Sequence, residues 1–395
     1  MKKYSLFLIA LFLGFQVSCQ EYPEGTFGND LKFLKQKTNP IVLEDGVRQI
    51  IISPEYQGRI LTATSKGKSG SSYGWFRKAL ILSDSVNQNK SGLGGAGRLW
   101  FGPDQGPNTL FFKINPKTGK KEHGAPKDLN ELEFKVLKRN ESLVSLGEKL
   151  HLKNLKNTEF YIDVKRDIKL LKRSLIEKKL GITLNDNLSY VAFKAETSMQ
   201  NIGEENWSKE KGLICLWELG CMHPSEKTTV VIPLKGKVDE ATVYFTPLDS
   251  TRIDIKENIL YYRADANYLN KIGTLPENSL EYFGSYSPEL NLLTIVRYSF
   301  NANTMDYVNA HPVSVKDQYR GDVINVFNDG KLGDIGPFGP FYELETSSPA
   351  VALKMGESLS HSHETYYFEG SKEDLNPIAV RVLGVNLDVI EKALP

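Results

Sequence analysis

The stretch at residues 190–199 reads YVAFKAETSM, and its side chains alternate well between apolar and polar. Val191 and Phe193 are apolar and fall on one face of an extended chain, whereas Lys194 and Glu196 fall on the other. Alternation with a period of two is typical of a β-strand that buries one face and exposes the other. We therefore predict a strand here, with one side packed on a core.

Similar strand signals recur on both sides of this stretch, in runs rich in β-branched and aromatic residues. The runs cover residues 48–52, 160–170, 228–234, 241–245, 259–263 and 292–300. Turn signals punctuate them, among them Asn-Ile-Gly at 201–203 and Asn-Asp-Gly at 328–330. Half-apolar strands bury their faces when large antiparallel sheets pack against each other. The predicted fold class is all-β.

Helix signals are few and lie near the C-terminus. Ser-Lys-Glu-Asp at residues 371–374 resembles a capping box and precedes an apolar run to Leu383, with Pro377 inside it. Residues 386–394 have the pattern of a short terminal helix. The prediction is therefore a large antiparallel β-sandwich with short C-terminal helices.

The charges of the 395-residue chain nearly cancel, since 49 Lys and Arg face 48 Asp and Glu. A surface without excess positive charge offers no footprint for polyanions, so we expect no nucleic-acid partner. No linker rich in proline or serine divides the chain. We expect one domain over residues 31–395, preceded by a tether at residues 20–30. Nothing in the sequence sets the oligomeric state.

The first nineteen residues read MKKYSLFLIALFLGFQVSC, with two lysines before an apolar run too short to span a bilayer. A small residue directly before Cys19 resembles a bacterial lipobox. We therefore expect a signal peptide at residues 1–19 and a lipid on Cys19, the protein's only contact with a membrane. This places the protein in the cell envelope of a Gram-negative-type bacterium, periplasmic or surface-exposed. The alternative is a plain secretory signal with a chance cysteine.

Cys215 and Cys221 remain once Cys19 is set aside. The segment between them reads as extended, and two residues six apart on a strand lie roughly 20 Å apart, too far for a disulfide. We predict two buried free thiols.

Three stretches carry a resemblance to a known superfamily. They are Pro-Glu-Tyr-Gln-Gly-Arg-Ile at 54–60, the segment 192–234 with Leu-Gly-Cys-Met-His-Pro at 219–224, and Phe-Tyr-Glu-Leu-Glu-Thr-Ser-Ser-Pro-Ala at 341–350. Their order and spacing resemble the galactose mutarotase-like supersandwich of aldose 1-epimerases. The last string, with Gly-Asp-Val-Ile-Asn at 321–325, resembles more narrowly an uncharacterised family of secreted bacterial lipoproteins in that superfamily. The likeness covers most of residues 30–385.

The resemblance implies a carbohydrate ligand and assigns roles to three residues. In epimerases of this fold a histidine acts as general acid on the ring oxygen and a glutamate as general base on the anomeric hydroxyl. The Gly-x-His-Pro-like string puts His223 in the acid's position, and Glu343 and Glu345 fall near the base. Ser225 and Glu226 follow where epimerases have aromatic residues, and a second catalytic histidine is not evident. The same fold also includes sugar-binding modules without catalysis, so glycan binding is the alternative function.

Each of these residues also has a structural interpretation. His223 could close a turn after Met222, and Glu343 and Glu345 could form salt bridges on a polar strand face. On a strand, residues two apart face the same side, so these two glutamates would share one environment.

A glycine-rich run at residues 92–97 precedes Arg98, Trp100 and Asp104. It lacks the Gly-Lys-Ser/Thr of a phosphate-binding loop and the strand–helix frame of a dinucleotide site, so we expect no cofactor. Arg98, Asp104, Trp100 and the more distant Arg59 are candidates for sugar contacts. An ion pair between Arg98 and Asp104 is the structural alternative.

His361 and His363 share one strand face, near Glu357 and Glu364. Two imidazoles could hold a metal, but the sequence identifies no third ligand. We expect no metal site.

Overall fold

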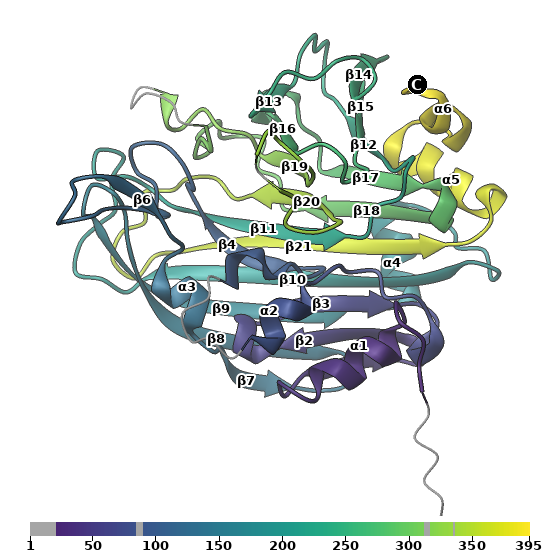
Figure 1. Cartoon of the computed structure of the whole chain (residues 1–395), viewed down its shortest axis with the longest axis horizontal. Coiled ribbons are helices and arrows are strands. Elements are labelled where there is room, and N and C mark those ends of the chain that lie inside the picture. The colour runs from purple at the N-terminus through teal and green to yellow at the C-terminus, as the bar shows by residue number, and fades with distance from the viewer. Residues whose placement is uncertain (1–20, 84–89, 312–316, 335) are drawn as a thin grey trace, which may run out of the picture.

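The computed structural model describes residues 21–83, 90–311, 317–334 and 336–395. Antiparallel strands dominate it, in two large sheets and two small ones (Figure 1). Cys19 and the expected signal peptide lie outside the described residues. Within them, no helix is both long and apolar enough to cross a membrane.

The larger sheet has ten strands in the order β14-β15-β12-β17-β18-β21-β10-β9-β8-β7. Their bounds are β7 Lys135–Arg139, β8 Leu143–Lys153, β9 Glu159–Leu170, β10 Ser189–Asn201, β12 Thr229–Pro233, β14 Ile253–Lys256, β15 Ile259–Arg263, β17 Tyr282–Ser287, β18 Leu292–Tyr298 and β21 Ser358–Glu369. The predicted strand at 190–199 is the centre of β10, which pairs along its length with β9 and β21.

The second large sheet has six strands in the order β13-β16-β19-β20-β11-β4. Their bounds are β4 Arg98–Gly102, β11 Cys215–Met222, β13 Thr242–Tyr244, β16 Asn270–Thr274, β19 Ile324–Asn328 and β20 Tyr342–Ser347. Two small sheets complete the fold, with strands β1 Ile41–Asp45, β2 Arg48–Ser53 and β3 Arg59–Thr64, and β5 Phe112–Ile114 and β6 Lys121–His123.

One core lies between the sheets. The inward residues of β10, such as Val191 and Phe193, share it with Phe101 of β4, Leu216 of β11 and Leu344 of β20. The three-stranded sheet extends this core at one end and carries helix α1 (Phe27–Leu34) on its other face.

Helices cover the opposite face of the ten-stranded sheet. These are α4 (Arg173–Leu180), α5 (Lys372–Leu383) and α6 (Leu387–Lys392); α5 and α6 pack side by side near the C-terminus (Figure 1). The remaining helices are α2 (Lys78–Leu82), α3 (Lys127–Glu131) and the short 3-10 helices Pro54–Tyr56, Gly67–Ser69, Lys90–Leu93, Pro276–Asn278 and Pro288–Leu290.

The prediction of an all-β antiparallel sandwich with C-terminal helices is confirmed. The Ser371 side chain caps α5 by accepting from Asp374 N, as the capping-box pattern predicts. Pro377 lies inside α5. The packed chain begins before residue 31, because Phe27, the first residue of α1, is fully buried, so residues 27–30 belong to the fold and not to a free tether.

Candidate functional site

The face of the six-stranded sheet that points away from the core carries charged and aromatic side chains. Strand pairing sets them beside one another: Leu219 of β11 pairs with Arg98 of β4 and with Glu345 of β20. Cys221 likewise pairs with Glu343. Alternation explains the arrangement, because the residues between them face the core.

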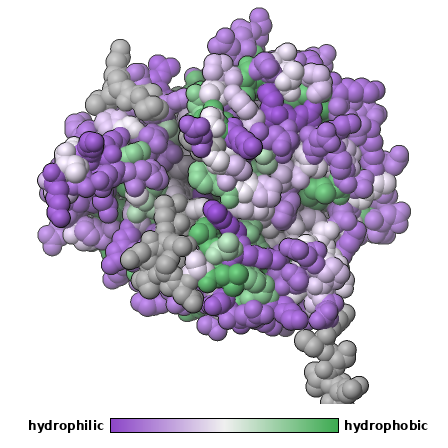
Figure 2. Space-filling model, viewed as in Figure 1, coloured by the Kyte–Doolittle hydropathy of each residue, from purple (hydrophilic) through white to green (hydrophobic). Residues whose placement is uncertain are grey.

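A cavity of about 240 Å³ opens on this face. Its lining includes Arg98, Trp100, Asp104, Phe111, His123, Trp217, Lys271, Phe341, Glu343 and Glu345. Figure 2 shows a recess in the molecular surface over β4, β11 and β20, beside the lobe that carries β5 and β6. The cavity therefore combines aromatic rings with ionisable groups.

Glu345 lies at the floor of the cavity and is fully buried. Its Oε2 accepts two hydrogen bonds, from Trp217 Nε1 at 2.9 Å and from Lys271 Nζ at 2.8 Å. Its Oε1 has no hydrogen-bond partner in the described part of the chain. Burial raises the pKa of Glu345 to about 7, against the attraction of Lys271 and with the repulsion of Glu343. The carboxyl group is thus poised to exchange a proton near neutral pH.

Glu343, two residues earlier on the same face, is held by two neighbours. Arg98 Nη2 lies 3.6 Å from its Oε1, and the Cys221 thiol donates to the same oxygen at 3.1 Å. Burial keeps the pKa of the Cys221 thiol well above its ordinary value, so the group stays a neutral donor.

Aromatic rings form one wall. The Trp100 and Phe111 rings are parallel with centroids 5.0 Å apart, and Phe111 stacks in turn on His123 at 6.4 Å. On the other side of Trp100 lies the Arg98 guanidinium, 4.2 Å from the ring centroid. Trp217 meets Trp100 edge to face. The wall therefore connects the exposed hairpin β5–β6 to the donor that binds Glu345.

Asp104 follows β4 and is half-buried at the edge of the cavity. Burial raises the pKa of its carboxyl group, and Lys271 works against that rise. Its Oδ1 is enclosed and has no partner among the residues described here. No ion pair between Arg98 and Asp104 occurs among the described salt bridges, since Arg98 pairs with Glu343.

Two predicted residues do not line this cavity. His223 comes just after β11, where Trp75 N donates to Cys221 O and Gly74 bridges Met222. Burial lowers the pKa of His223, whose charged neighbours are Asp30 and Lys78. Arg59 is buried behind the glycine-rich run and donates to Gly94 O at 2.9 Å. The structure brings together Glu343, Glu345, Arg98, Trp100 and Asp104, and leaves His223 and Arg59 outside.

His361 and His363 lie in the core on β21 and not at the cavity. His361 Nε2 and His363 Nδ1 are each 2.9 Å from the Thr346 hydroxyl. Across the described ranges, no group of three or more His, Cys, Asp or Glu is placed to hold a metal ion. Cys215 and Cys221 are both buried and unbridged, which confirms the prediction of free thiols.

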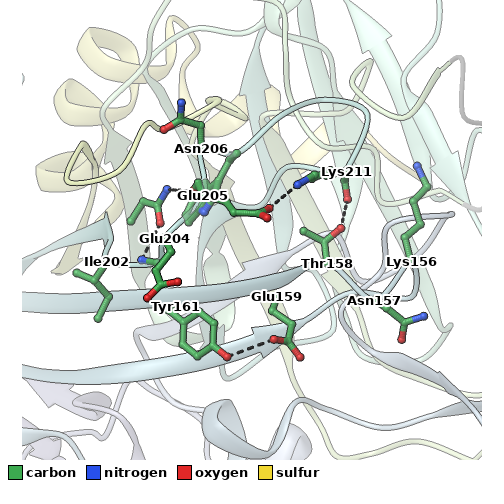
Figure 3. A pocket seen from close by; sticks show the side chains of 13 residues that line it. Lys156, Asn157, Thr158, Glu159, Tyr161, Ile202, Glu204, Glu205, Asn206 and Lys211 are labelled. Atoms are coloured by element: carbon green, nitrogen blue, oxygen red, sulfur yellow. Dashed lines mark hydrogen bonds and ion pairs between the residues drawn. The ribbon is translucent and has the colours of Figure 1, made fainter.

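A larger cavity of about 880 Å³ lies elsewhere, at the ends of β9 and β10 (Figure 3). Its polar groups mostly bind one another: Tyr161 donates to Glu159, Lys211 pairs with Glu205, and Thr158 donates to the Lys211 carbonyl. These groups are exposed and already satisfied, so we place the functional site at the smaller cavity.

Lys271, His123 and Phe111 were missed by sequence reasoning. Lys271 is a single lysine in a short polar strand, and His123 lies in a charged hairpin with no motif around it. Only the pairing of strands and the folding of the hairpin bring them to Glu345. Trp217 was expected in the core, with a cleft as the alternative.

Comparisons with known proteins give a family and several similar folds. A family model described as "Family of unknown function (DUF6786)" matches residues 25–394. No curated protein matches the sequence. Among solved structures, a putative aldose 1-epimerase from Escherichia coli K12 is 11% identical, with a TM-score of 0.49 over 84% of this chain and 99% of that one. A galactose mutarotase-like protein from Lactobacillus casei is 10% identical, with a TM-score of 0.48 over 83% and 100% of the two chains.

Proposed function

The chain belongs to DUF6786, a family of unknown function, and we propose that it binds a sugar in the cavity over β4, β11 and β20, with Glu345 as the proton-accepting group. The observation that carries the proposal is the unequal hydrogen bonding of the two carboxylate oxygens of Glu345. One carboxylate oxygen is fixed by two donors, and the other is buried against the cavity with no donor among the described residues. A buried acceptor is costly unless a ligand supplies the missing hydrogen bond.

The lining suits a sugar. Aromatic rings offer flat apolar faces, and the carboxylates and Arg98 offer acceptors and donors for hydroxyl groups. The volume of about 240 Å³ lies below the ~300–1,000 Å³ that is usual for pockets of drug-sized ligands. We infer that one sugar ring, and not an extended chain, enters the cavity.

The chemistry open to Glu345 is proton transfer at the anomeric centre. A carboxylate whose pKa is about 7 accepts a hydroxyl proton and returns it at neutral pH. The order and spacing of the three stretches that resemble aldose 1-epimerases, which put Glu345 near the position of the base, support this role. The size of the cavity and the acceptor in it together favour an aldose whose ring opens and closes.

Glycan binding without chemistry is the second candidate. The observation that favours it is the position of His223, which the resemblance casts as the acid but which lies beyond the end of β11. Without this histidine as the acid, the cavity would bind a sugar and leave it unchanged.

The test is a panel of free sugars screened by thermal shift, followed by polarimetry on every sugar that binds. We expect Glu345→Gln to abolish any mutarotation and to weaken binding, whereas Glu133→Gln, at an exposed position, leaves both unchanged. Binding without turnover, unaffected by Glu345→Gln, would leave only the binding module. If no sugar stabilises the protein, the proposal fails.

For location, we propose that a lipid on Cys19 anchors the protein outside the cytoplasm. The support is the sequence of residues 1–19 alone. Cys19→Ser should move the protein from the membrane fraction to the soluble fraction of the same cells, and a variant that stays in the membrane fraction would contradict the proposal.

A further inference from the structure

Lys271 and Trp217 approach Glu345 from opposite sides of β20. Trp217 lies on β11, the neighbouring strand, whereas Lys271 lies on β16 and reaches across β19. Both donate to the same oxygen, Oε2. A carboxylate with both donors on one oxygen is held in a single orientation, and its second oxygen is left for the cavity.

The ammonium group of Lys271 is buried among Glu345, Trp217 and Tyr244. The side chain is only 7% exposed. Its Nζ lies 4.5 Å from the centroid of the Trp217 ring and 5.6 Å from that of Tyr244. Such aromatic faces attract a cation, so the lysine has favourable contacts even in the absence of bulk water.

We propose that Lys271 is the positioning residue of this site: it keeps Glu345 ionised and turned toward the ligand, and it thereby sets the pH below which the cavity loses its ligand. The pH dependence of binding rests on the proposed function, whereas the effect on Glu345 itself does not.

The surrounding charges support this role. Burial alone would lower the pKa of Lys271, but the charges of Glu345 and Asp104 outweigh it and the pKa is raised, so the lysine remains a cation. The same lysine restrains the rise in the pKa of Glu345, which burial and Glu343 drive. The titratable and charged groups around this pair come from several packed elements. They are Arg98 on β4, Asp104 after it, His123 on β6, Cys221 on β11, Tyr244 on β13, His311 stacked on Tyr244, Asp322 just before β19, and Glu343 on β20.

These charges determine in which direction the pKa of Glu345 changes when Lys271 is removed. With Lys271 present, Glu345 releases its proton around pH 7. Without the cation, burial and Glu343 are no longer opposed, so the pKa of Glu345 rises further and the carboxyl is protonated at neutral pH. Protonation removes the proton-accepting function and lets the carboxyl rotate away from Trp217.

The experiment compares Lys271→Met, Lys271→Arg and the wild-type protein. The carboxyl band of Glu345 is isolated by infrared difference spectroscopy against Glu345→Gln and followed from about pH 5 to about pH 9. Sugar affinity is measured over the same range by calorimetry, with the sugar that gives the largest thermal shift. Lys179→Met is the matched control, because Lys179 also pairs with a buried glutamate, Glu364 at 2.7 Å, away from the cavity.

We expect Lys271→Met to raise the midpoint of the Glu345 band by at least about one pH unit. At pH 7 the ionised fraction of Glu345 then falls from about one half to about one tenth, so binding should weaken at least about fivefold. Lys271→Arg should restore most of the wild-type midpoint, and Lys179→Met should leave it unchanged. If Lys271→Met does not fold, Lys271→Gln, which keeps a donor without the charge, takes its place.

An unchanged or lowered midpoint would overturn the proposal. A raised midpoint in Lys271→Met, together with no sugar binding by the wild-type protein, would support the role of Lys271 and refute the proposed function. The two proposals therefore fail separately.

Discussion

Arg166 of β9 and Glu218 of β11 form an ion pair inside the core, where their side chains are 0% and 1% exposed. Thr197 of β10 binds both partners, and Arg166 Nε donates to Gly58 O at 3.2 Å. The pair therefore joins the ten-stranded sheet to the six-stranded sheet at β11, the strand that also carries Trp217. It is one of several buried polar contacts between the two sheets, together with those from His361 and His363 of β21 to Thr346 of β20, and it carries full charges on both partners.

Removing the carboxylate should strongly destabilise the fold. Glu218→Leu leaves the Arg166 charge buried without its partner, and such losses cost about 3–5 kcal/mol. Urea unfolding followed by circular dichroism measures the change. The control is Glu131→Gln, which breaks an exposed pair with Lys127 and should cost no more than about 0.5 kcal/mol. Equal effects of the two substitutions would contradict the importance of the buried pair.

The buried histidines should make stability fall in acid. Burial lowers the pKa of His361 and of His363 from 6.5 to about 3. Below pH 6.5 the unfolded chain binds protons that the folded chain does not, so stability is full above the unfolded-state pKa and falls as the pH drops toward 3. The Thr346 hydroxyl has one hydrogen, so it donates to one neutral ring and accepts from the other.

A single substitution isolates this effect. His363→Asn places an amide where Nδ1 binds Thr346 and removes one titrating group, so the melting temperature should fall less steeply between neutral and acid pH than in the wild type. His151→Asn, at an exposed position stacked on Tyr161, should keep the wild-type slope. A slope unchanged by His363→Asn would exclude this histidine as the source.

Alternation predicted strands such as β9, which buries one face and exposes the other. The predicted runs at 160–170 and 190–199 became β9 and β10 almost residue for residue. Helices α1 and α4 were not predicted: each has only eight residues, and a helix that short depends on packing against a sheet, which local sequence does not reveal.

The candidate site was predicted only in part, for a topological reason. Glu343 and Glu345 lie two apart on one strand, so their common face follows from the sequence alone. His223 is also an even number of residues from Cys221, but β11 ends at Met222, where the segment around Trp75 pairs with it in the antiparallel direction. Lys271 reaches the site only through the order of β16, β19 and β20, which no local pattern encodes.

The two free thiols should be protected in the folded protein. Cys215 and Cys221 are both fully buried, and burial raises the pKa of Cys215 to about 12, so little thiolate is available. We expect almost no reaction with a disulfide reagent under native conditions and two equivalents in denaturant, for a protein that starts after residue 19. Rapid native reaction of either thiol would show that the sheet opens near the cavity.

Substituting one aromatic residue in each cavity tests which cavity binds the sugar. Trp100 forms the wall beside Glu345, whereas Tyr161 lines the larger cavity at the ends of β9 and β10. Trp100→Leu should weaken sugar binding about tenfold, since a stacked aromatic contact is worth about 0.5–1.5 kcal/mol beyond its buried area. Tyr161→Leu should leave the affinity unchanged, because its cavity supplies no unpaired buried acceptor among the described residues. Calorimetric titration with one sugar compares both variants at equal folding, which circular dichroism checks. The reverse result, with Tyr161→Leu weakening binding and Trp100→Leu not, would move the site to the larger cavity and leave Glu345 without a ligand.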